Sequence, residues 1–251
     1  MADPRFKAIV LDLFDTLVTW NPALLPMVNW HGREFRSTTP LLYPILEESL
    51  GAHFDREAFM DAHSKVYEEI FATRSRDEVE ISCLDRFTRT LVRIGVEPAL
   101  AALLAERLRR THMARVREVT AAPAARLEAV RRLHQHYRLG LLSNFDDAAT
   151  GHEIMHDTGI RELFDVVVIS AELGLRKPHR EIFRHTLDAL ALKPGEILFV
   201  GDTPHEDVLG AKRMGIHVAW INKHGKPFPE GIGVPEIEIS DLTELPDRLG
   251  C

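Results

Sequence analysis

The chain carries two distinct patterns of hydrophobic and polar positions. Short, mostly apolar runs occur near the amino terminus and again beyond residue 138, and each is bounded by polar residues or glycine. Runs of this length, partly β-branched, are typical of strands that are buried on both faces of a sheet. The pattern predicts strands over 8–11, 139–142, 164–170, 197–200 and 217–221.

Between residues 38 and about 120 the apolar residues recur at spacings of three and four, which indicates helices. The predicted helices cover 41–50, 55–73, 82–94 and 98–116. No strand is predicted in this stretch, so we expect an all-helical subdomain of antiparallel helices. It follows a predicted hairpin whose turn is His31-Gly32. Its histidines, His53, His63 and His112, lack the spacing of metal ligands and are interpreted as structural.

Beyond residue 120, predicted strands alternate with predicted helices. The helices cover 123–137, 148–158, 180–190 and 204–214, and an edge strand is predicted near 236–239. Repeated strand–helix units favour a parallel sheet with right-handed crossovers. We therefore predict a Rossmann-like α/β core of residues 1–20 and 121–251, interrupted by a helical cap insertion of residues 21–120. Because the insertion follows the first strand directly, its position suggests a lid over the carboxyl edge of the sheet.

Composition excludes some classes of function. The 251 residues include 38 acidic and 31 basic side chains, and the resulting net charge of −7 argues against a nucleic-acid partner. The apolar runs are too short to span a membrane, and the chain does not begin with a secretory pattern. Cys83 and Cys251 are expected to be free thiols in a reducing compartment. We therefore expect a cytoplasmic protein that acts on a small molecule; the sequence does not indicate an oligomeric state.

Polar residues follow four of the predicted strands, either directly or within one loop. They are Asp12, Ser143, Lys177 and the pair Asp202 and Asp207. Each has a simpler interpretation by itself, as a turn residue, a helix cap or a solvated loop lysine. Because the carboxyl ends of parallel strands meet at one edge of a sheet, we expect these side chains to converge on one site.

The residue types at these strand ends suit phosphoryl chemistry. Asp12 and Asp202 offer the hard oxygen ligands that Mg²⁺ prefers. The Ser143 hydroxyl, with N–H groups at the following helix start, can bind an anion. Lys177 can neutralise a phosphoryl oxygen and Asp12, and Asp207 can orient Lys177 or a metal-bound water.

The predicted hairpin carries two further cations. Arg33 and Arg36 either contact an anionic substrate or form a solvated face of the hairpin.

Together these motifs resemble those of the haloacid dehalogenase-like (HAD) hydrolase superfamily, in its branch with a helical C1-type cap. The motifs are Asp12-Leu13-Phe14-Asp15-Thr16-Leu17, then Ser143-Asn144, Lys177-Pro178, and Gly201-Asp202 with Asp207. The resemblance implies that Asp12 is a nucleophile that forms an aspartyl intermediate, which water hydrolyses. It implies that Mg²⁺ is held by Asp12, the backbone carbonyl of Phe14 and Asp202, with Asp207 nearby. It also assigns Thr16 and Asn144 to substrate binding.

The sequence departs from the family pattern at Phe14. Phosphatases of the family carry there a second aspartate, which serves as general acid and base. A phenyl ring cannot transfer a proton, and loss of this help costs about 10²–10⁴-fold in rate. Asp15 takes the next position, usually a glycine, and its side chain is expected to point elsewhere. Three explanations follow. The substrate has a leaving group that needs no proton, or another proton donor (a cap histidine, Lys65 or a water) replaces the missing aspartate. In the third, the reaction is not phosphate-ester hydrolysis.

Three alternatives to a phosphatase stay open. The 2-haloacid dehalogenases of the family also have an aromatic residue at the position of Phe14, but they use no metal, and here Asp202 and Asp207 keep the metal-retaining pattern. A phosphonate-cleaving variant would use a cap lysine, for which Lys65 is the candidate. A regulatory protein without turnover is the third. We predict a Mg²⁺-dependent phosphatase-type hydrolase of a small phosphorylated metabolite with a good leaving group.

Overall fold

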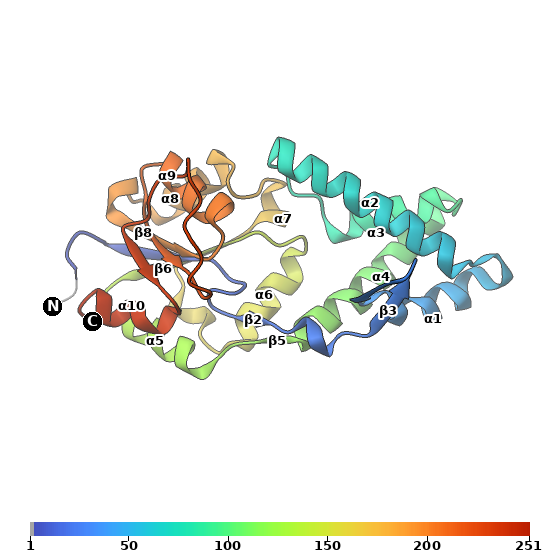
Figure 1. Ribbon diagram of the computed structural model, residues 1–251, viewed down its shortest axis with the longest axis horizontal. Helices are drawn as coiled ribbons and strands as arrows, with labels where there is room; N and C mark the ends of the chain where they lie inside the picture. The colour runs from blue at the N-terminus through green and yellow to red at the C-terminus, as the bar shows by residue number, and fades with distance from the viewer. Residues whose placement is uncertain (1–2) are drawn as a thin grey trace. The chain divides into compact units, whose positions relative to one another are not determined.

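A computed structural model describes residues 3–251, which form two compact units (Figure 1). The core unit combines the chain up to Trp20 with Ala121–Cys251, and the second unit is Asn21–Thr120. Strands β2 (Thr19–Trp20) and β5 (Thr120–Ala121) lie where the chain leaves and re-enters the core unit. None of the helices in the described chain is both long and apolar enough to cross a membrane.

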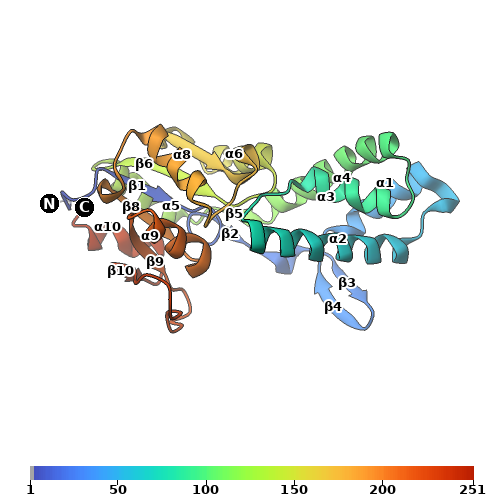
Figure 2. The ribbon, with the colours of Figure 1, turned by 90° about the horizontal axis from the view of Figure 1, so that it is seen from above.

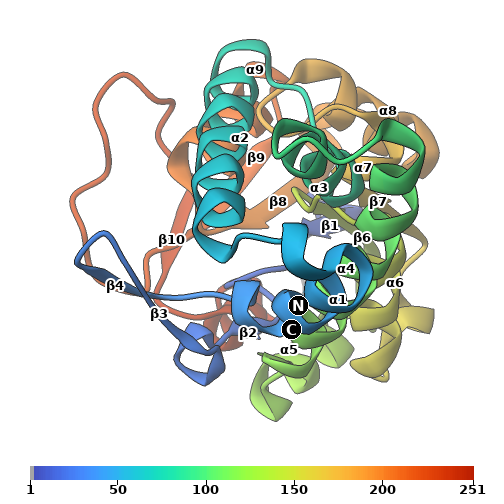
Figure 3. The same ribbon diagram turned by 90° about the vertical axis from the view of Figure 1, so that its right-hand side faces the viewer.

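The core unit is built on a six-stranded parallel sheet, which confirms the predicted α/β fold class. Its strands are β1 (Ala8–Leu11), β6 (Arg138–Ser143), β7 (Val166–Ile169), β8 (Ile197–Gly201), β9 (His217–Ile221) and β10 (Ile237–Ile239). They are arranged in the order β10-β9-β8-β1-β6-β7 (Figure 3). The central strand β1 pairs with both β6 and β8, so that Ile9 lies opposite Leu139 on one side and Leu198 on the other.

Alternate residues of each strand pack on opposite faces of the sheet, as the pleat of a strand requires. Ile9 and Leu11 belong to a core that includes α5 (Ala124–His134), α6 (Ala148–Asp157) and α10 (Leu245–Arg248). Ala8 and Val10 belong to the opposite core, with α8 (Arg180–Leu190) and α9 (Leu209–Arg213). Figure 1 shows these two groups of helices on the two faces of the sheet. Both faces of β1 are therefore buried, which explains its uninterrupted apolar run.

Several elements differ from the predicted ones. The strand predicted over 164–170 is limited to β7, because the 3-10 turn η3 (Arg161–Leu163) precedes it and α7 (Ser170–Leu173) follows it. The helix predicted over 204–214 begins as a π-helical turn, η5 (Pro204–Val208), before α9. Helices α7 and α10 were not predicted, because four residues are too few to show a helical period. The other 3-10 turns are η1 (Pro22–Leu24), η2 (Gly51–His53), η4 (Pro194–Glu196) and η6 (Leu242–Glu244).

The second unit contains four helices, as the apolar spacing predicts. They are α1 (Thr39–Leu50), α2 (Arg56–Asp77), α3 (Cys83–Arg93) and α4 (Pro98–Glu118). Side chains cap three of them: Asp55, Ser82 and Glu97 each accept hydrogen bonds from backbone N–H groups of the first turn. Helix α3 packs against both α2 and α4, and α1 packs against α4.

The second unit is not helical throughout, because a hairpin precedes its helices (Figure 2). Strands β3 (Met27–Trp30) and β4 (Arg33–Arg36) pair antiparallel, with Trp30 opposite Arg33. The two turn residues both adopt positive φ, 49° for His31 and 72° for Gly32. Positive φ at both central positions is the signature of a two-residue hairpin turn, so the predicted hairpin is confirmed.

Two of the three cap histidines have structural partners. The ring of His63 stacks between Phe59 and Phe87, with centroid distances of 5.8 and 5.5 Å. His112 Nε2 lies 3.4 Å from an Arg86 N–H donor, so its Nδ1–H donates to Thr38 Oγ1 at 2.6 Å. The side chain of His53 lies outside the described residues.

Candidate active site

Asp12 occupies the carboxyl end of the central strand. Its backbone N–H donates to the Val200 carbonyl at 2.9 Å, so the β1–β8 ladder continues one residue beyond β1. The chain then turns sharply, since the N–H groups of Leu17 and Val18 both donate to the Leu13 carbonyl at 2.9 Å. The Asp12 side chain is 9% exposed. A carboxylate is thus held in a nearly dry position by the rigid centre of the sheet.

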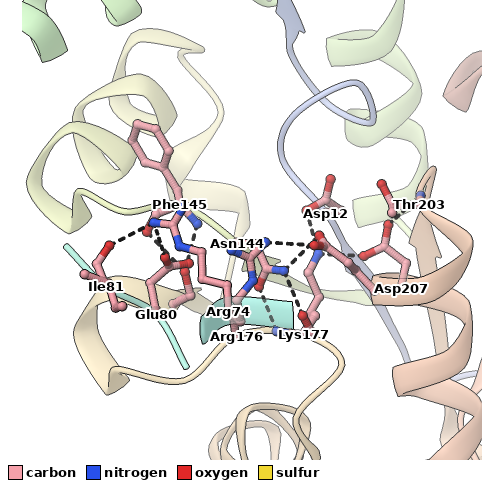
Figure 4. A network of polar contacts seen from close by, with 12 residues as sticks. Asp12, Arg74, Glu80, Ile81, Asn144, Phe145, Arg176, Lys177, Thr203 and Asp207 are labelled. Carbon is pink, nitrogen blue, oxygen red and sulfur yellow. Dashed lines mark hydrogen bonds and ion pairs between the residues drawn. The ribbon is translucent and has the colours of Figure 1, made fainter. Parts of the chain in front are cut away.

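Lys177 is the cationic partner of Asp12 (Figure 4). Its ammonium donates to Asp12 Oδ1 at 2.6 Å and to the Leu142 carbonyl at the end of β6 at 2.9 Å. Asp207 Oδ1 lies 2.7 Å from the same nitrogen. The ammonium thus forms two hydrogen bonds and a further ion pair with Asp207, and the Lys177 side chain is 1% exposed.

Asp207 reaches Lys177 from the first turn after β8. Its second oxygen, Oδ2, accepts the Thr203 N–H at 2.9 Å, while its own N–H donates to the Thr203 carbonyl at 2.8 Å (Figure 4). The side chain passes directly over Gly201, where a Cβ would overlap with the Asp207 carboxylate. Glycine at the end of β8 is therefore what admits this carboxylate to the site.

Asp202 brings a third carboxylate to the same point. Oxygen atoms of Asp12, Asp202 and Asp207 all lie within 4.8 Å of one another. The Asp202 backbone is tethered, because its carbonyl accepts the indole N–H of Trp220 at 2.9 Å. When all three carboxylates are ionised, the Lys177 ammonium neutralises only one of them. A cluster of such hard oxygen donors is the ligand set that Mg²⁺ takes in proteins. The residues present thus fit a divalent cation.

Burial and mutual repulsion change the titration of these groups. Burial is the largest effect on Asp12, and together with the Asp207 and Asp202 charges it raises the pKa to about 8 against the opposing effect of Lys177. Burial and the charges of Asp207 and Asp15 raise the pKa of Asp202 to about 6. Burial lowers the pKa of Lys177, but the two neighbouring carboxylates outweigh it and raise the pKa above the ordinary lysine value. The pKa shifts of Asp12 and Asp202 both disfavour the charged carboxylates, so a cation bound between these two residues would stabilise their ionised forms.

Two hydroxyl groups of the predicted site have no partner among the described residues. Ser143 follows Leu142 at the end of β6, and Thr16 lies in the turn after Asp12; both side chains are fully buried, and neither hydroxyl forms a hydrogen bond. An unsatisfied buried hydroxyl costs about 1–3 kcal/mol. Ser143, next to the carbonyl that binds Lys177, is thus placed where an anionic ligand could satisfy it; the assignment of Thr16 to substrate binding stays a prediction.

Asn144 holds Lys177 in place. Its Oδ1 accepts the Lys177 N–H at 2.7 Å, and its Nδ2 donates to the Lys177 carbonyl at 3.0 Å and to Glu206 Oε2 at 2.9 Å. Glu206 in turn pairs with Arg176 at 2.7 Å. All polar hydrogens of the amide are used in these bonds, so a direct substrate contact of Asn144 stays a prediction. Sequence reasoning missed Glu206 and Arg176, because their partners lie 30 or more residues away and no local motif marks them.

Phe14 occupies the turn position two residues after Asp12. Its ring contacts that of Phe145, with centroids 5.0 Å apart, and packs against the core on that face of the sheet. Asp15 adopts a φ of +57°, a conformation that glycine takes most easily. It lines the same cavity as Asp202. Asp12 and Lys177 do not line that cavity, and the expectation that Asp15 points away from the general-acid position stays a prediction.

The remaining predicted residues lie in the second unit. Arg33 and Arg36 are exposed on β4, and Arg36 donates to the Leu25 carbonyl at 2.8 Å within that unit. Lys65 lies on α2. Their roles toward a substrate stay predictions.

A family model for haloacid dehalogenase-like hydrolases matches residues 6–215, most of the chain. The chain belongs to this family. The match includes Asp12, Ser143, Lys177, Asp202 and Asp207, and it classes the protein as a hydrolase. The resemblance inferred from the motifs is thereby confirmed.

Curated relatives and a solved structure agree with this assignment. The chain is 29% identical over 167 residues to the pyrimidine 5′-nucleotidase YjjG of Escherichia coli, a match that covers 66% of this chain and 70% of that protein. It is 35% identical over 118 residues to the N-acylneuraminate-9-phosphatase of Mus musculus and spans about half of that relative, 47% of each chain. A 2-haloacid dehalogenase structure from Pseudomonas syringae covers 98% of both chains with a TM-score of 0.71 at 20% identity, which shows a shared fold.

Proposed function

We propose that this protein is a Mg²⁺-dependent phosphatase-type hydrolase that uses Asp12 as its nucleophile on a small phosphorylated metabolite. The observation that carries the proposal is the grouping of Asp12 with Asp202, Asp207 and Lys177 at the carboxyl edge of the sheet. The relatives named above, a nucleotidase and a phosphatase, support phosphoryl transfer as the reaction class. Neither Cys83 nor Cys251 forms a disulfide in the described chain, which suits the cytoplasmic setting that we propose.

Mg²⁺ would be held by Asp12, Asp202 and the backbone carbonyl of Phe14, and it would neutralise charge on the phosphoryl group. Lys177 supplies the remaining positive charge. Its ammonium is fixed by Asp207 and by the Leu142 carbonyl, so it needs no rearrangement during the reaction. The Ser143 hydroxyl is available to donate to a phosphoryl oxygen.

The proposed reaction has two displacement steps. Lys177 binds one Asp12 oxygen, Oδ1, so the other oxygen attacks phosphorus and the leaving group departs with its electron pair. The resulting aspartyl phosphate is then attacked by water at phosphorus, which releases phosphate and restores the Asp12 carboxylate. Burial of Asp12 keeps bulk water from competing with the carboxylate in the first step.

Phe14 restricts the substrate in this scheme. Its ring is packed on Phe145, so the position where a proton donor would stand carries no titratable group. We propose that the leaving group departs without protonation, as carboxylates and phosphates do from acyl phosphates and phosphoanhydrides. Residues 21–120, a separate compact unit, would then select the substrate, with Arg33 and Arg36 as the proposed anion contacts.

The test is a panel of phosphorylated metabolites assayed for phosphate release with Mg²⁺ and with EDTA. We expect Mg²⁺-dependent release that favours acyl phosphates and is lost in Asp12→Asn. Asp188→Asn, an exposed acid on α8, is the matched control and should retain full activity. Release that is indifferent to EDTA would contradict the metal assignment, and an active Asp12→Asn would contradict the nucleophile.

One observation favours a second candidate function, 2-haloacid dehalogenation. The ring of Phe14 packs against Phe145, so this position offers an apolar surface and no proton donor, and the departure of a halide needs none. Halide release from 2-chloropropionate in the presence of EDTA would support it over the phosphatase. The three-carboxylate cluster weighs against it, because a reaction without metal does not need Asp202 and Asp207 beside the nucleophile.

A further inference from the structure

A cavity of about 310 Å³ lies beside the candidate metal site, within the core unit. Its volume is at the lower end of the range for small-molecule pockets. Its lining includes Asp15 from the loop after β1, Asp202 from the loop after β8, Trp220 from β9, and Lys223, His224 and Lys226 from the connection between β9 and β10. Neither Asp12 nor Lys177 lines it. A ligand group in this cavity would therefore lie beyond the reacting phosphoryl group.

The connection between β9 and β10 is anchored at its start by Asn222. This buried side chain accepts the Lys226 N–H at 2.9 Å and donates to the Lys226 carbonyl at 2.9 Å and to Glu238 at 2.6 Å. Gly225, with a φ of 58°, closes the turn between them. The amide thus fixes residues 223–226 as a defined turn.

Trp220 joins the same connection to the metal site. Its indole N–H donates to the Asp202 carbonyl, and its ring contacts Phe228 edge-to-face with centroids 4.9 Å apart. One side chain therefore positions both Asp202 and the far part of the loop. The long loop that carries these contacts leaves the sheet after β9 (Figure 2).

The loop presents cations without carboxylate partners. Lys223 and Lys226 are exposed, and within the described chain neither ammonium lies within ion-pairing distance of a carboxylate. His224 lines the cavity between them. Asp202 is a ligand of the metal in the proposed function, so of the charged groups here only Asp15 opposes the two lysines. The cavity then carries a net positive charge and favours an anion.

We propose that this cavity is a second anion subsite, which binds a carboxylate or phosphate carried by the substrate in addition to its reacting phosphoryl group. The inference rests on the proposed function, since it assigns the neighbouring site to the reacting group. It narrows the substrate to a metabolite with at least two anionic groups. Lys223 and Lys226 are the specificity residues, and Asn222 and Trp220 are positioning residues.

Binding of phosphonates, which are not hydrolysed, tests the proposal without turnover. Calorimetry in Mg²⁺ would compare alkylphosphonates with ω-carboxyalkylphosphonates and alkane diphosphonates over a series of chain lengths. We expect one chain length at which a second anionic group tightens binding about tenfold. The carboxylate and diphosphonate arms distinguish the two sources of negative charge.

The lysines are tested by the double variant Lys223→Gln/Lys226→Gln, whose exposed side chains can change without affecting the core. It should lose the tenfold preference and keep the affinity for alkylphosphonates. The matched control Lys193→Gln removes an exposed lysine that precedes the amino end of β8, at the opposite edge of the sheet, and should keep the preference.

The outcomes separate the two proposals. A preference that is absent at all chain lengths, or that persists in the double variant, would overturn the anion subsite. Failure of every phosphonate to bind in Mg²⁺ would count against the reacting site itself, and so against the proposed function. Alkylphosphonate binding that needs Mg²⁺, without any preference for a second charge, would retain the function and overturn only the subsite.

Discussion

The Asp207 carboxylate occupies the space that a side chain on Gly201 would need. Gly201 ends β8, and Asp207 lies in the first turn of the helix that follows, so the two meet because the chain reverses between them. The carboxylate that crosses this glycine is the one that holds Lys177 against Asp12. The absence of a side chain at Gly201 thus allows Asp207 to reach Lys177 and pair with it.

Gly201→Ala is therefore expected to disable the site. The new methyl group must displace the Asp207 carboxylate, and with it Lys177, so we expect kcat to fall by about 10²-fold or more. Overpacking should also destabilise the core by about 1–3 kcal/mol. The control is Gly195→Ala, where a Cβ would meet nothing within 4 Å, and it should leave both activity and thermal stability unchanged. Equal effects of the two substitutions would contradict this account.

Lys177→Met should destabilise the folded protein strongly. Removal of the ammonium leaves Asp12 and Asp207 buried beside each other without compensation, which typically costs about 3–5 kcal/mol. Urea denaturation measures this loss. Lys7→Met removes an exposed ion pair with Glu196 and should cost less than about 1 kcal/mol. Adding Asp207→Asn to Lys177→Met should restore part of the stability; a purely additive loss would argue against coupling of these groups.

Phe14→Asp should restore general acid catalysis selectively. Hydrolysis of substrates with poor leaving groups is expected to rise relative to acyl phosphates, by up to about 10²-fold, because only the former need a proton. Phe14→Ala controls for the lost contact with Phe145 and should change both substrate classes equally. Steady-state kinetics with an alkyl phosphate and an acyl phosphate decide the point, and a uniform change in Phe14→Asp would refute it.

The second unit is expected to lose stability in acid. Burial, with the charge of Arg86, lowers the pKa of both His63 and His112 to about 3, against 6.5 for an unperturbed histidine. Between these values the unfolded chain binds more protons than the folded one, so the free energy of unfolding falls as pH decreases. Each histidine should cost about 2 kcal/mol between pH 6.5 and pH 5.

Urea denaturation at these two pH values checks the expectation. His63→Phe keeps a ring between Phe59 and Phe87 and should reduce the acid sensitivity by about half. His185→Gln, at an exposed position on α8, should leave it unchanged. Acid sensitivity that is the same in His63→Phe and in the natural sequence would contradict the assignment.

Mg²⁺ should stabilise the protein through the carboxylate cluster. A ligand that binds only the folded state adds about 2.7 kcal/mol at a hundred times its Kd, so we expect the melting temperature to rise with Mg²⁺. Asp202→Asn should abolish this rise, and Asp188→Asn should retain it. A thermal shift series over Mg²⁺ concentration measures both, with Na⁺ at equal ionic strength to separate binding from screening.

Much of this protein was predictable from its sequence alone. The apolar runs over 8–11 and 197–200 identified strands, because burial on both faces of a sheet leaves no alternative to hydrophobic residues there. Since parallel strands end at one edge, the positions of Asp12 and Asp202 just after these strands were enough to bring them together. Periodicity predicted the four helices of the second unit for a similar reason.

Other features depended on tertiary structure. Asn144 forms hydrogen bonds with the backbone of Lys177, 33 residues away, and Trp220 donates one to the backbone of Asp202, 18 residues away. The sequence around these residues does not indicate either pairing. The left-handed backbone of Asp15 likewise follows from the geometry of the turn around it. Local patterns reflect which side chains must avoid water, and so they determined the strands, the helices and the edge that carries the site. Hydrogen bonds and close contacts depend on where distant segments meet, and only the folded chain decided those.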